Sequence, residues 1–220
     1  LRNIENHDGV VYLNCESGKK PQFKNNFRHF TITDPYTIYT IFDEAEKSNK
    51  IHTIIIDSQT YLMDMFYSMY IANAVDTQKG WNLYGEYFRV LMLNYVAKST
   101  KNIFFTAHTL SIFNENESII ETKVPIKGAL KGCGVESYFS IVIAAKKVSI
   151  TTLEKYKNDL LTITEEEAEI GVKHVFQTRL TKETVHERIS SPIDMWSVNE
   201  TYIDNDISLV LKRIKQYNNN

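Results

Sequence analysis

Unbroken apolar runs that end in polar residues recur along the chain and predict the strands of a parallel sheet. The clearest run is Thr53–Ile56, which leads directly into Asp57 and Ser58. An apolar run without alternation indicates a strand that is buried on both faces. Because ligands of open α/β sheets bind at the carboxyl ends of the strands, we expect the Asp57 side chain to face a ligand.

Asp57 has two interpretations. An acid at the end of a buried strand is typical of a Walker B strand, in which the carboxylate holds the water shell of a nucleotide-bound Mg²⁺. An aspartate at this point also often caps the following helix, because its side chain accepts hydrogen bonds from the first free N–H groups of that helix. The strand alone does not separate these two roles.

Two further polar residues follow expected strands in the same way. Glu16 follows the run Val10–Asn14, and His108 follows Asn102–Thr106. If these strands are neighbours, one acid can hold a metal ion while the other orients water for attack. A solvated loop acid and a structural histidine are the simpler alternatives for Glu16 and His108. Three polar termini in one sheet nevertheless favour a common site.

Strand and helix patterns alternate along the chain, which predicts a right-handed crossover and a parallel sheet. Asp34 and Pro35 form a helix start signal, with Asp34 as the N-cap. The polar segment Asp76–Asn82 is expected to be a loop. The other expected elements are a strand at His29–Ile32, a helix from Tyr84, strands at Tyr138–Ala145 and Val172–Leu180, and a last helix at Ile207–Ile214.

Three segments have a less regular pattern. Tyr61–Tyr70 is rich in methionine and aromatic residues, which form core or a subunit contact more often than a cofactor site. Ser111–Lys131 lacks periodicity and is expected to be a functional loop, whose lysines are either solvated or in contact with an anion or nucleic acid. Residues 151–171 are polar, with a capping box between Thr164 and Glu167, and are expected to form a surface insertion.

Composition narrows the class of protein. The 220 residues are 43% hydrophobic and 24% charged, so the chain can form one globular domain over residues 1–220. A net charge of −2 leaves only local basic loops for a contact with nucleic acid. The two cysteines, Cys15 and Cys133, have no metal-ligand spacing, which fits a reducing cytoplasm. The sequence shows neither a leader nor an apolar run of membrane-spanning length, so no membrane partner is expected.

The ordered strand termini resemble those of the RecA-like ATPase core over most of the chain. The closest resemblance is to the phage Sak-type single-strand annealing or recombination ATPases of the AAA family. It is carried by Glu16, Asp57 with Ser58, Thr106-Ala107-His108, and a strand that ends in Gln177-Thr178-Arg179. The resemblance implies a mainly parallel twisted sheet flanked by helices, with a C-terminal antiparallel strand or hairpin. It also implies ATP and Mg²⁺ as cofactors.

The same resemblance implies roles for individual residues. Glu16 matches the general base that polarises the attacking water, and Asp57, beside Ser58, matches the Walker B acid on the Mg²⁺ shell. His108 matches the polar sensor of the γ-phosphate. A cation that reaches the γ-phosphate of a neighbouring subunit is implied as well. The candidates for this trans finger are Arg179, Lys182 and Arg188.

The resemblance further implies partners. In the family, the loops after the Walker B and sensor strands touch single-stranded DNA inside a ring or filament of identical subunits. These loops correspond to Tyr67–Asn82 and Ser111–Lys131 here. The DNA-binding candidates in the second loop are Lys123, Lys127 and Lys131. A single-strand-binding protein is a further candidate partner.

One departure from the family pattern concerns the phosphates. The P-loop with its lysine and hydroxyl residue is expected before Val10, and the sequence contains no such motif. Leu1–Asn6 resemble the end of a helix, as expected for the helix that follows a P-loop, which favours an upstream P-loop outside these residues. The alternative is a core that no longer hydrolyses ATP.

The sequence therefore leaves three functions open. The first is an oligomeric, DNA-dependent ATPase of phage recombination or replication. The second is a non-catalytic interaction or assembly protein with the RecA fold, for which the stripe Tyr61–Tyr70 is the candidate contact surface. The third is a nucleotide-using enzyme outside recombination, such as a kinase or a helicase loader.

Overall fold

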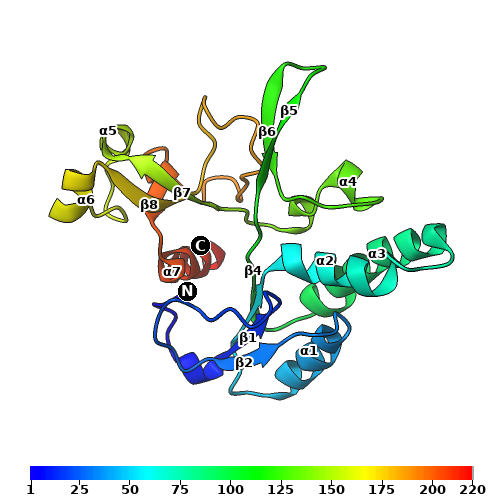
Figure 1. Cartoon of the computed structure of the whole chain (residues 1–220). Coiled ribbons are helices and arrows are strands. Elements are labelled where there is room, and N and C mark those ends of the chain that lie inside the picture. Colours follow the sequence, from blue (N-terminus) through cyan, green and yellow to red (C-terminus); the bar gives the residue numbers. More distant parts are fainter. Residues whose placement is uncertain (220) are drawn as a thin grey trace. The chain divides into compact units, whose positions relative to one another are not determined.

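The computed structural model describes residues 1–219 as two compact units (Figure 1). We call Asn6–Leu110 together with Val124–Tyr138 the sheet unit. We call the remainder the antiparallel unit, which consists of Leu1–Glu5, Ser111–Lys123 and the chain from Phe139 onward. The chain therefore leaves the sheet unit after Leu110, returns to it at Val124, and leaves it again after Tyr138.

The sheet unit is built on a parallel sheet of four strands in the order β2-β1-β3-β4. The strands are β1 (Val10–Asn14), β2 (Arg28–Thr31), β3 (Thr53–Asp57) and β4 (Asn102–Phe105). All five residues of β1 and the first four of β3 are buried, as expected for central strands that are covered on both faces. The predicted α/β fold with a mainly parallel sheet is confirmed.

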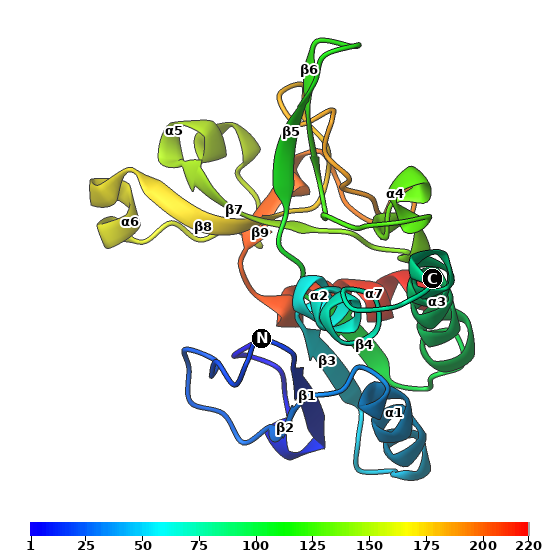
Figure 2. The same cartoon turned by 45° about the vertical axis from the view of Figure 1, so that its right-hand side comes forward.

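Helices and short helical turns connect these strands (Figure 2). The buried face of the first helix contains Ile38, Phe42 and Ala45, which recur with the spacing expected of an amphipathic helix. The helical elements of the sheet unit are η1 (His7–Gly9), α1 (Thr37–Lys47), α2 (Gln59–Tyr70), α3 (Thr77–Val90), the π-helix η2 (Leu91–Val96), α4 (Leu130–Cys133) and η3 (Glu136–Tyr138).

The antiparallel unit contains a hairpin and a three-stranded sheet. The hairpin joins β5 (Leu110–Asn114) to β6 (Ile119–Lys123). Leu110, the first residue of β5, still belongs to the sheet unit. The sheet has the order β7-β8-β9, and both strand pairs are antiparallel. Its elements are β7 (Ala144–Ser149), α5 (Ile150–Leu153), η4 (Glu154–Tyr156), α6 (Glu165–Ile170), β8 (Val172–Gln177), η5 (Asn199–Thr201), β9 (Tyr202–Asp204) and α7 (Ile207–Asn218). These strands confirm the predicted C-terminal antiparallel segment.

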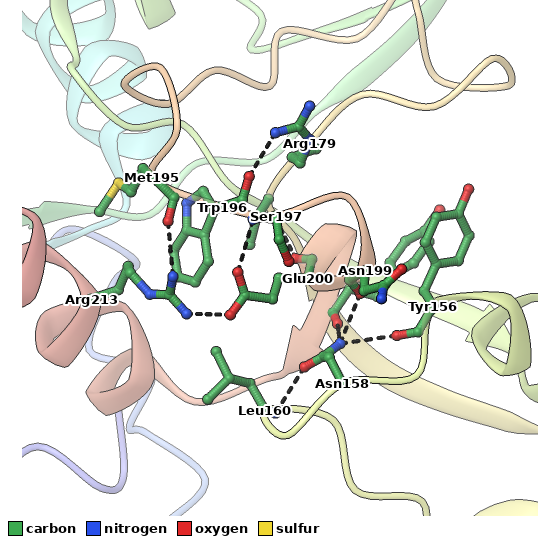
Figure 3. Close-up of polar contacts among 12 residues, drawn as sticks. Tyr156, Asn158, Leu160, Arg179, Met195, Trp196, Ser197, Asn199, Glu200 and Arg213 are labelled. Carbon is green, nitrogen blue, oxygen red and sulfur yellow. Dashed lines mark hydrogen bonds and ion pairs between the residues drawn. The ribbon is translucent and has the colours of Figure 1, made fainter.

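Polar contacts hold the chain that leads into β9 (Figure 3). The Asn158 side-chain amide donates to the backbone carbonyls of Asn199 and Tyr202, both at 2.9 Å. The Arg213 guanidinium donates to the Met195 carbonyl at 3.1 Å and pairs with the Glu200 carboxylate. These side chains bond backbone carbonyls before and within β9, so they help to fix the segment that leads into this strand.

Four local predictions were wrong. The first helix begins at Thr37 rather than at Pro35, because Asp34 forms a turn in which its side chain accepts from the Tyr36 N–H at 2.9 Å. No helix forms at Leu1–Asn6, where the chain has turns. The expected buried strand at Tyr138–Ala145 is instead irregular until β7 begins at Ala144. The fourth is the conformation of the two segments that were expected to be DNA-binding loops, because much of each is helix or strand.

Most of the first of these loops is helical. Thr77–Asn82 belongs to α3, because the Asp76 side chain caps the helix by accepting from the Lys79 N–H at 2.9 Å. Residues 67–70 belong to α2, so only residues 71–76 connect the two helices. The second expected loop, Ser111–Lys131, contains most of the β5–β6 hairpin and the start of α4.

The capping box predicted between Thr164 and Glu167 is confirmed, and it begins α6. One face of the methionine and aromatic stripe is internal, because Leu62, Met63 and Phe66 are buried, whereas Tyr61 and Met69 are exposed. Among the described residues, no helix is both long enough and apolar enough to cross a membrane.

Candidate functional site

The site lies at the carboxyl edge of the parallel sheet. Asn14 at the end of β1 pairs in register with Asp57 at the end of β3. Ile56 pairs with Phe105, so Thr106 follows β4 beside Asp57. Strand register therefore brings the ends of β1, β3 and β4 to one edge, which is where ligands of open α/β sheets bind.

Two neighbouring strands hold the Asp57 carboxylate. The Tyr12 hydroxyl donates to Oδ2 and the Thr106 hydroxyl donates to Oδ1, so one donor comes from each side of β3. Burial, followed by the hydrogen bond to Asp57, raises the pKa of Tyr12 well above its usual value of 10.0. Tyr12 therefore stays protonated and acts only as a donor toward Asp57.

Glu16 is the centre of a second group of contacts. Its Oε1 accepts from the Ser58 hydroxyl at 2.9 Å and is 3.0 Å from His108 Nε2. Its Oε2 accepts from Lys19 Nζ at 3.2 Å. The Glu16 side chain is only 10% exposed, so these three partners replace most of its water.

The charge state of Glu16 follows from these contacts. Burial raises the pKa of Glu16, but the hydrogen bonds from His108, Ser58 and Lys19 together outweigh burial and hold the pKa below its ordinary value of 4.5. Burial and the two nearby acids, Asp57 and Glu16, raise the pKa of the adjacent Cys15 thiol to about 12. The site therefore contains a carboxylate that is charged at neutral pH and a thiol that is inert.

The backbone beside Asp57 links β3 to β4. The Asp57–Ser58 peptide bond is cis, and Ser58 is buried at the start of α2. The Gln59 N–H donates to the Thr106 carbonyl at 2.8 Å, and the His108 N–H donates to the Thr60 hydroxyl at 3.0 Å. His108 is thus anchored through both its backbone and its ring, although its side chain is 57% exposed.

The structure brings together Glu16, Ser58 and His108 directly, with Asp57 next to Ser58 in the chain. The three trans finger candidates lie in the antiparallel unit instead. Arg179 donates from Nη1 to the Trp196 carbonyl at 2.6 Å (Figure 3). The roles inferred for all of these residues stay predictions.

The DNA-binding candidates are divided between the units. Lys123 ends β6 in the antiparallel unit and pairs with Glu121 at 2.7 Å. Lys127 is in the sheet unit, where its Nζ lies 3.8 Å from the centre of the Tyr67 ring and 3.4 Å from Asp64. Lys131 is exposed in α4. Their role in binding DNA also stays a prediction.

Sequence reasoning missed three residues of the site, namely Tyr12, Lys19 and Thr106. Tyr12 carries the one polar group among the apolar side chains of Val10–Leu13, and it lies on the same strand face as Asn14. A hydroxyl two residues before the strand end is thus a signal that could have identified it. The sequence gives no comparable signal for Lys19, and it identifies Thr106 only as the end of a strand and as part of Thr106-Ala107-His108.

The residues at this edge fit a Mg²⁺ ion that is shared with a nucleotide. No group of three or more His, Cys, Asp or Glu side chains within residues 1–219 could hold a metal ion by itself. Mg²⁺ keeps several waters and binds through one or two carboxylates together with substrate phosphates, which requires no such cage. Asp57 is a carboxylate of this kind, fixed from both sides.

A parallel sheet flanked by helices, with acids at the carboxyl ends of adjacent strands, places the chain among the α/β proteins that bind ligands at this edge. Residues 4–182 match a family model described as an AAA domain, and the chain belongs to this family. Family membership supports an ATPase-type function with the use of a nucleotide and usually Mg²⁺. No curated protein matches the chain, and no solved structure matches it.

Proposed function

We propose that the protein is a Mg²⁺-dependent ATPase that acts on single-stranded DNA as an oligomeric ring or filament. We place it in phage recombination or replication, in the cytoplasm of a host cell, as a protein of the Sak type. The observation that supports this best is the grouping of Glu16, Ser58 and His108 beside the doubly held Asp57. Family membership supports the ATPase part of the proposal.

When bound, ATP would supply the phosphoryl group, and Mg²⁺ would supply the positive charge that offsets the charge of the phosphates. In this proposal the carboxylate of Asp57 holds the water shell of the ion, and Tyr12 and Thr106 keep that carboxylate in one orientation. The two hydroxyls come from strands on both sides, so the orientation is set by the sheet rather than by a flexible loop.

Glu16 orients the attacking water. Its lowered pKa makes it a weak proton acceptor in the resting site, so it acts on water mainly through hydrogen bonding and charge. His108 shares Oε1 with Ser58, which means that any movement of the histidine ring changes the environment of Glu16. This contact couples Glu16 to the segment that leads into the β5–β6 hairpin.

ATP hydrolysis by the protein with its natural N-terminus tests this proposal. Wild type, Glu16→Gln and Asp57→Ala are compared with and without single-stranded DNA, and Glu44→Gln on the exposed side of α1 is the control. We expect Glu16→Gln to bind Mg-nucleotide while hydrolysis falls about 10²- to 10⁴-fold. Asp57→Ala is expected to lose Mg-dependent nucleotide affinity.

The outcomes separate the parts of the proposal. A wild-type protein that binds neither Mg-nucleotide nor single-stranded DNA contradicts it as a whole. Equal loss of binding and hydrolysis in Glu16→Gln shows that Glu16 holds the nucleotide rather than the water. Hydrolysis that does not respond to DNA leaves an ATPase but removes DNA as its partner.

A further inference from the structure

An open cavity of about 370 Å³ lies on α3 within the sheet unit. This volume falls within the range of about 300–1,000 Å³ that is typical of small-molecule sites. Aromatic, cationic and amide side chains all line it, together with the small residue Ala129 of the returning segment. The residues used below are Lys79, Trp81, Asn82, Glu86 and Arg89.

The indole of Trp81 is held in place by its neighbours. Its ring lies 5.5 Å from that of Tyr67 and 5.6 Å from that of Tyr84, between ring centres. Gly128 approaches it so closely that a Cβ there would lie 3.1 Å from the ring. Tyr84 is buried, so this support belongs to the core. Packing within the protein therefore sets the position of the Trp81 ring.

Two cations line the same cavity as Trp81. Lys79 and Arg89 both line the cavity, and Glu86 is the one acid among its lining residues. Arg89 pairs with Glu86 only loosely, at 3.8 Å, and both side chains are substantially exposed. Gly85 has no side chain that would fill the space beside the Arg89 guanidinium, since a Cβ there would lie 3.6 Å from it. Two cations against one acid give the cavity a net positive lining.

We propose that this cavity binds one unpaired nucleotide of a single-stranded nucleic acid. The base stacks on Trp81, Asn82 bonds to the base edge, and Lys79 and Arg89 bind the adjacent phosphate. Aromatic rings accept any base by stacking, and nearby cations follow the backbone. The inference rests on the proposed function, because it names the surface through which that function contacts its strand.

Tryptophan fluorescence tests the inference without any substitution. The chain has two tryptophans, and Trp196 is only 1% exposed, so a stacking base can reach Trp81 alone. We expect an oligodeoxythymidylate to quench the emission at low salt, and the same concentration of free thymidine monophosphate to quench it far less. Equal quenching by the two would show a site for a free nucleotide and would overturn the assignment to a strand.

Variants locate the contact. Trp81→Ala is expected to weaken oligonucleotide binding about 5- to 150-fold, the range for one lost stacking contact. Phe30→Ala removes an aromatic ring that is 43% exposed on β2 and is the matched control, with unchanged affinity expected. Arg89→Gln is expected to weaken binding and to reduce its dependence on salt, because it removes one phosphate contact. Lys47→Gln on α1 is the cationic control.

Anisotropy of a labelled oligonucleotide measures affinity, and circular dichroism confirms that each variant folds. If wild type binds no oligonucleotide, the proposed function fails and this inference fails with it. If wild type binds while Trp81→Ala and Arg89→Gln bind equally well and wild-type emission does not change, only this inference is overturned. Should Trp81→Ala not fold, the wild-type quenching and the Arg89→Gln affinity decide between these outcomes.

Discussion

At the scale of single residues, the hydroxyl of Tyr12 donates to the carboxylate of Asp57, as that of Tyr70 does to Asp34. Tyr39 also donates from its hydroxyl, at 2.7 Å, but to the backbone carbonyl of Tyr87. Hydrogen bonds to charged groups contribute about 1.5–3 kcal/mol, whereas neutral ones contribute about 0.5–1.5 kcal/mol. The two phenols therefore offer a matched comparison.

We predict that Tyr12→Phe lowers the free energy of unfolding by about 1.5–3 kcal/mol and Tyr39→Phe by about 0.5–1.5 kcal/mol. Urea unfolding at neutral pH measures both. Tyr12→Phe should also weaken Mg-dependent nucleotide binding, because the carboxylate loses one of the two groups that fix it. A larger stability loss in Tyr39→Phe would mean that the Asp57 carboxylate contributes nothing beyond a neutral acceptor.

Glu16 makes stability depend on pH. Its pKa is lower in the folded protein than its ordinary value of 4.5, because hydrogen bonds from His108, Ser58 and Lys19 outweigh the opposing effect of burial. The folded state therefore gains stability from Glu16 above that ordinary value, and this gain is lost as pH falls through the folded pKa. The acid limb of the stability curve contains this contribution.

We predict that the difference in unfolding free energy between wild type and Glu16→Gln is largest near pH 6 and shrinks steadily as pH falls below about 4.5. Urea unfolding at several pH values measures this difference. Taking the difference between wild type and variant cancels the pH dependence that comes from the other acids. Glu44→Gln on the surface of α1 serves as a control. A difference that stays constant down to acid pH would show that the contacts of Glu16 do not depend on its charge.

The sequence predicted that three polar residues would follow three strands of one sheet, and the structure brings Glu16 and His108 within 3.0 Å. The end of a buried strand can be recognised in the sequence because the apolar run stops there and a polar residue follows. The donors to Asp57 were not predicted. Tyr12 lies inside an apolar run that is typical of the core, and only the register of β1 against β3 shows that its face of the strand meets Asp57.

At the scale of elements, glycine conformation decides how α6 ends. Gly171 follows this helix with a φ of 80°, in the left-handed region, and a Cβ built there would meet nothing within 4 Å. Gly132 in α4 also has open space around a built Cβ, but its φ is not in the left-handed region. The two sites therefore differ in backbone conformation rather than in room.

We predict that Gly171→Ala lowers the free energy of unfolding by about 1–2 kcal/mol, because the Cβ of alanine makes the left-handed conformation unfavourable. Gly132→Ala is expected to be neutral or to stabilise by up to about 1 kcal/mol, since it restricts the unfolded chain without strain. Thermal or urea unfolding compares them. Equal effects of the two substitutions would contradict the conformational argument.

Elements with a clear apolar pattern were predictable, whereas the strand β5 was not. The strands β1, β3 and β4 follow from apolar runs that end in polar residues, and α1 follows from the helical spacing of its apolar face. The strand β5 is exposed at Leu110 through Phe113, so no buried face imposes an alternating pattern on the sequence. In α3, Gly80 suggests a loop, but it packs against Ile71, where a Cβ would lie 3.4 Å from the side chain. Tertiary packing overrides local propensity there.

At the scale of the whole molecule, each unit has a core and a tryptophan of its own. Trp196 packs with Met195, Ile203 and Val210 in the antiparallel unit. Trp81 packs on Tyr67 and Tyr84 in the sheet unit. The chain passes between the units after Glu5, Leu110, Lys123 and Tyr138, so neither unit is a single continuous segment. Whether the two cores unfold together is therefore an experimental question with two local probes.

We predict that the units respond separately to a core substitution. Ile203 is fully buried, and Ile203→Ala removes packing within the antiparallel unit at a cost of about 2–5 kcal/mol. In a Trp81→Phe background, the urea midpoint reported by Trp196 should fall by the full amount. In a Trp196→Phe background, the midpoint reported by Trp81 should change much less, because the substitution removes no contact around that ring.

Ile55→Ala in β3 is the reciprocal experiment. Ile55 is also fully buried, so the lost packing is of similar size but lies in the sheet unit. Its effect should appear mainly in the midpoint reported by Trp81. Equal shifts of both midpoints for both substitutions would contradict the prediction, since they would show that the two units unfold as one cooperative structure. Separate shifts would mean that a nucleotide bound at the sheet edge stabilises the sheet unit first, because a ligand protects the unit that holds its site.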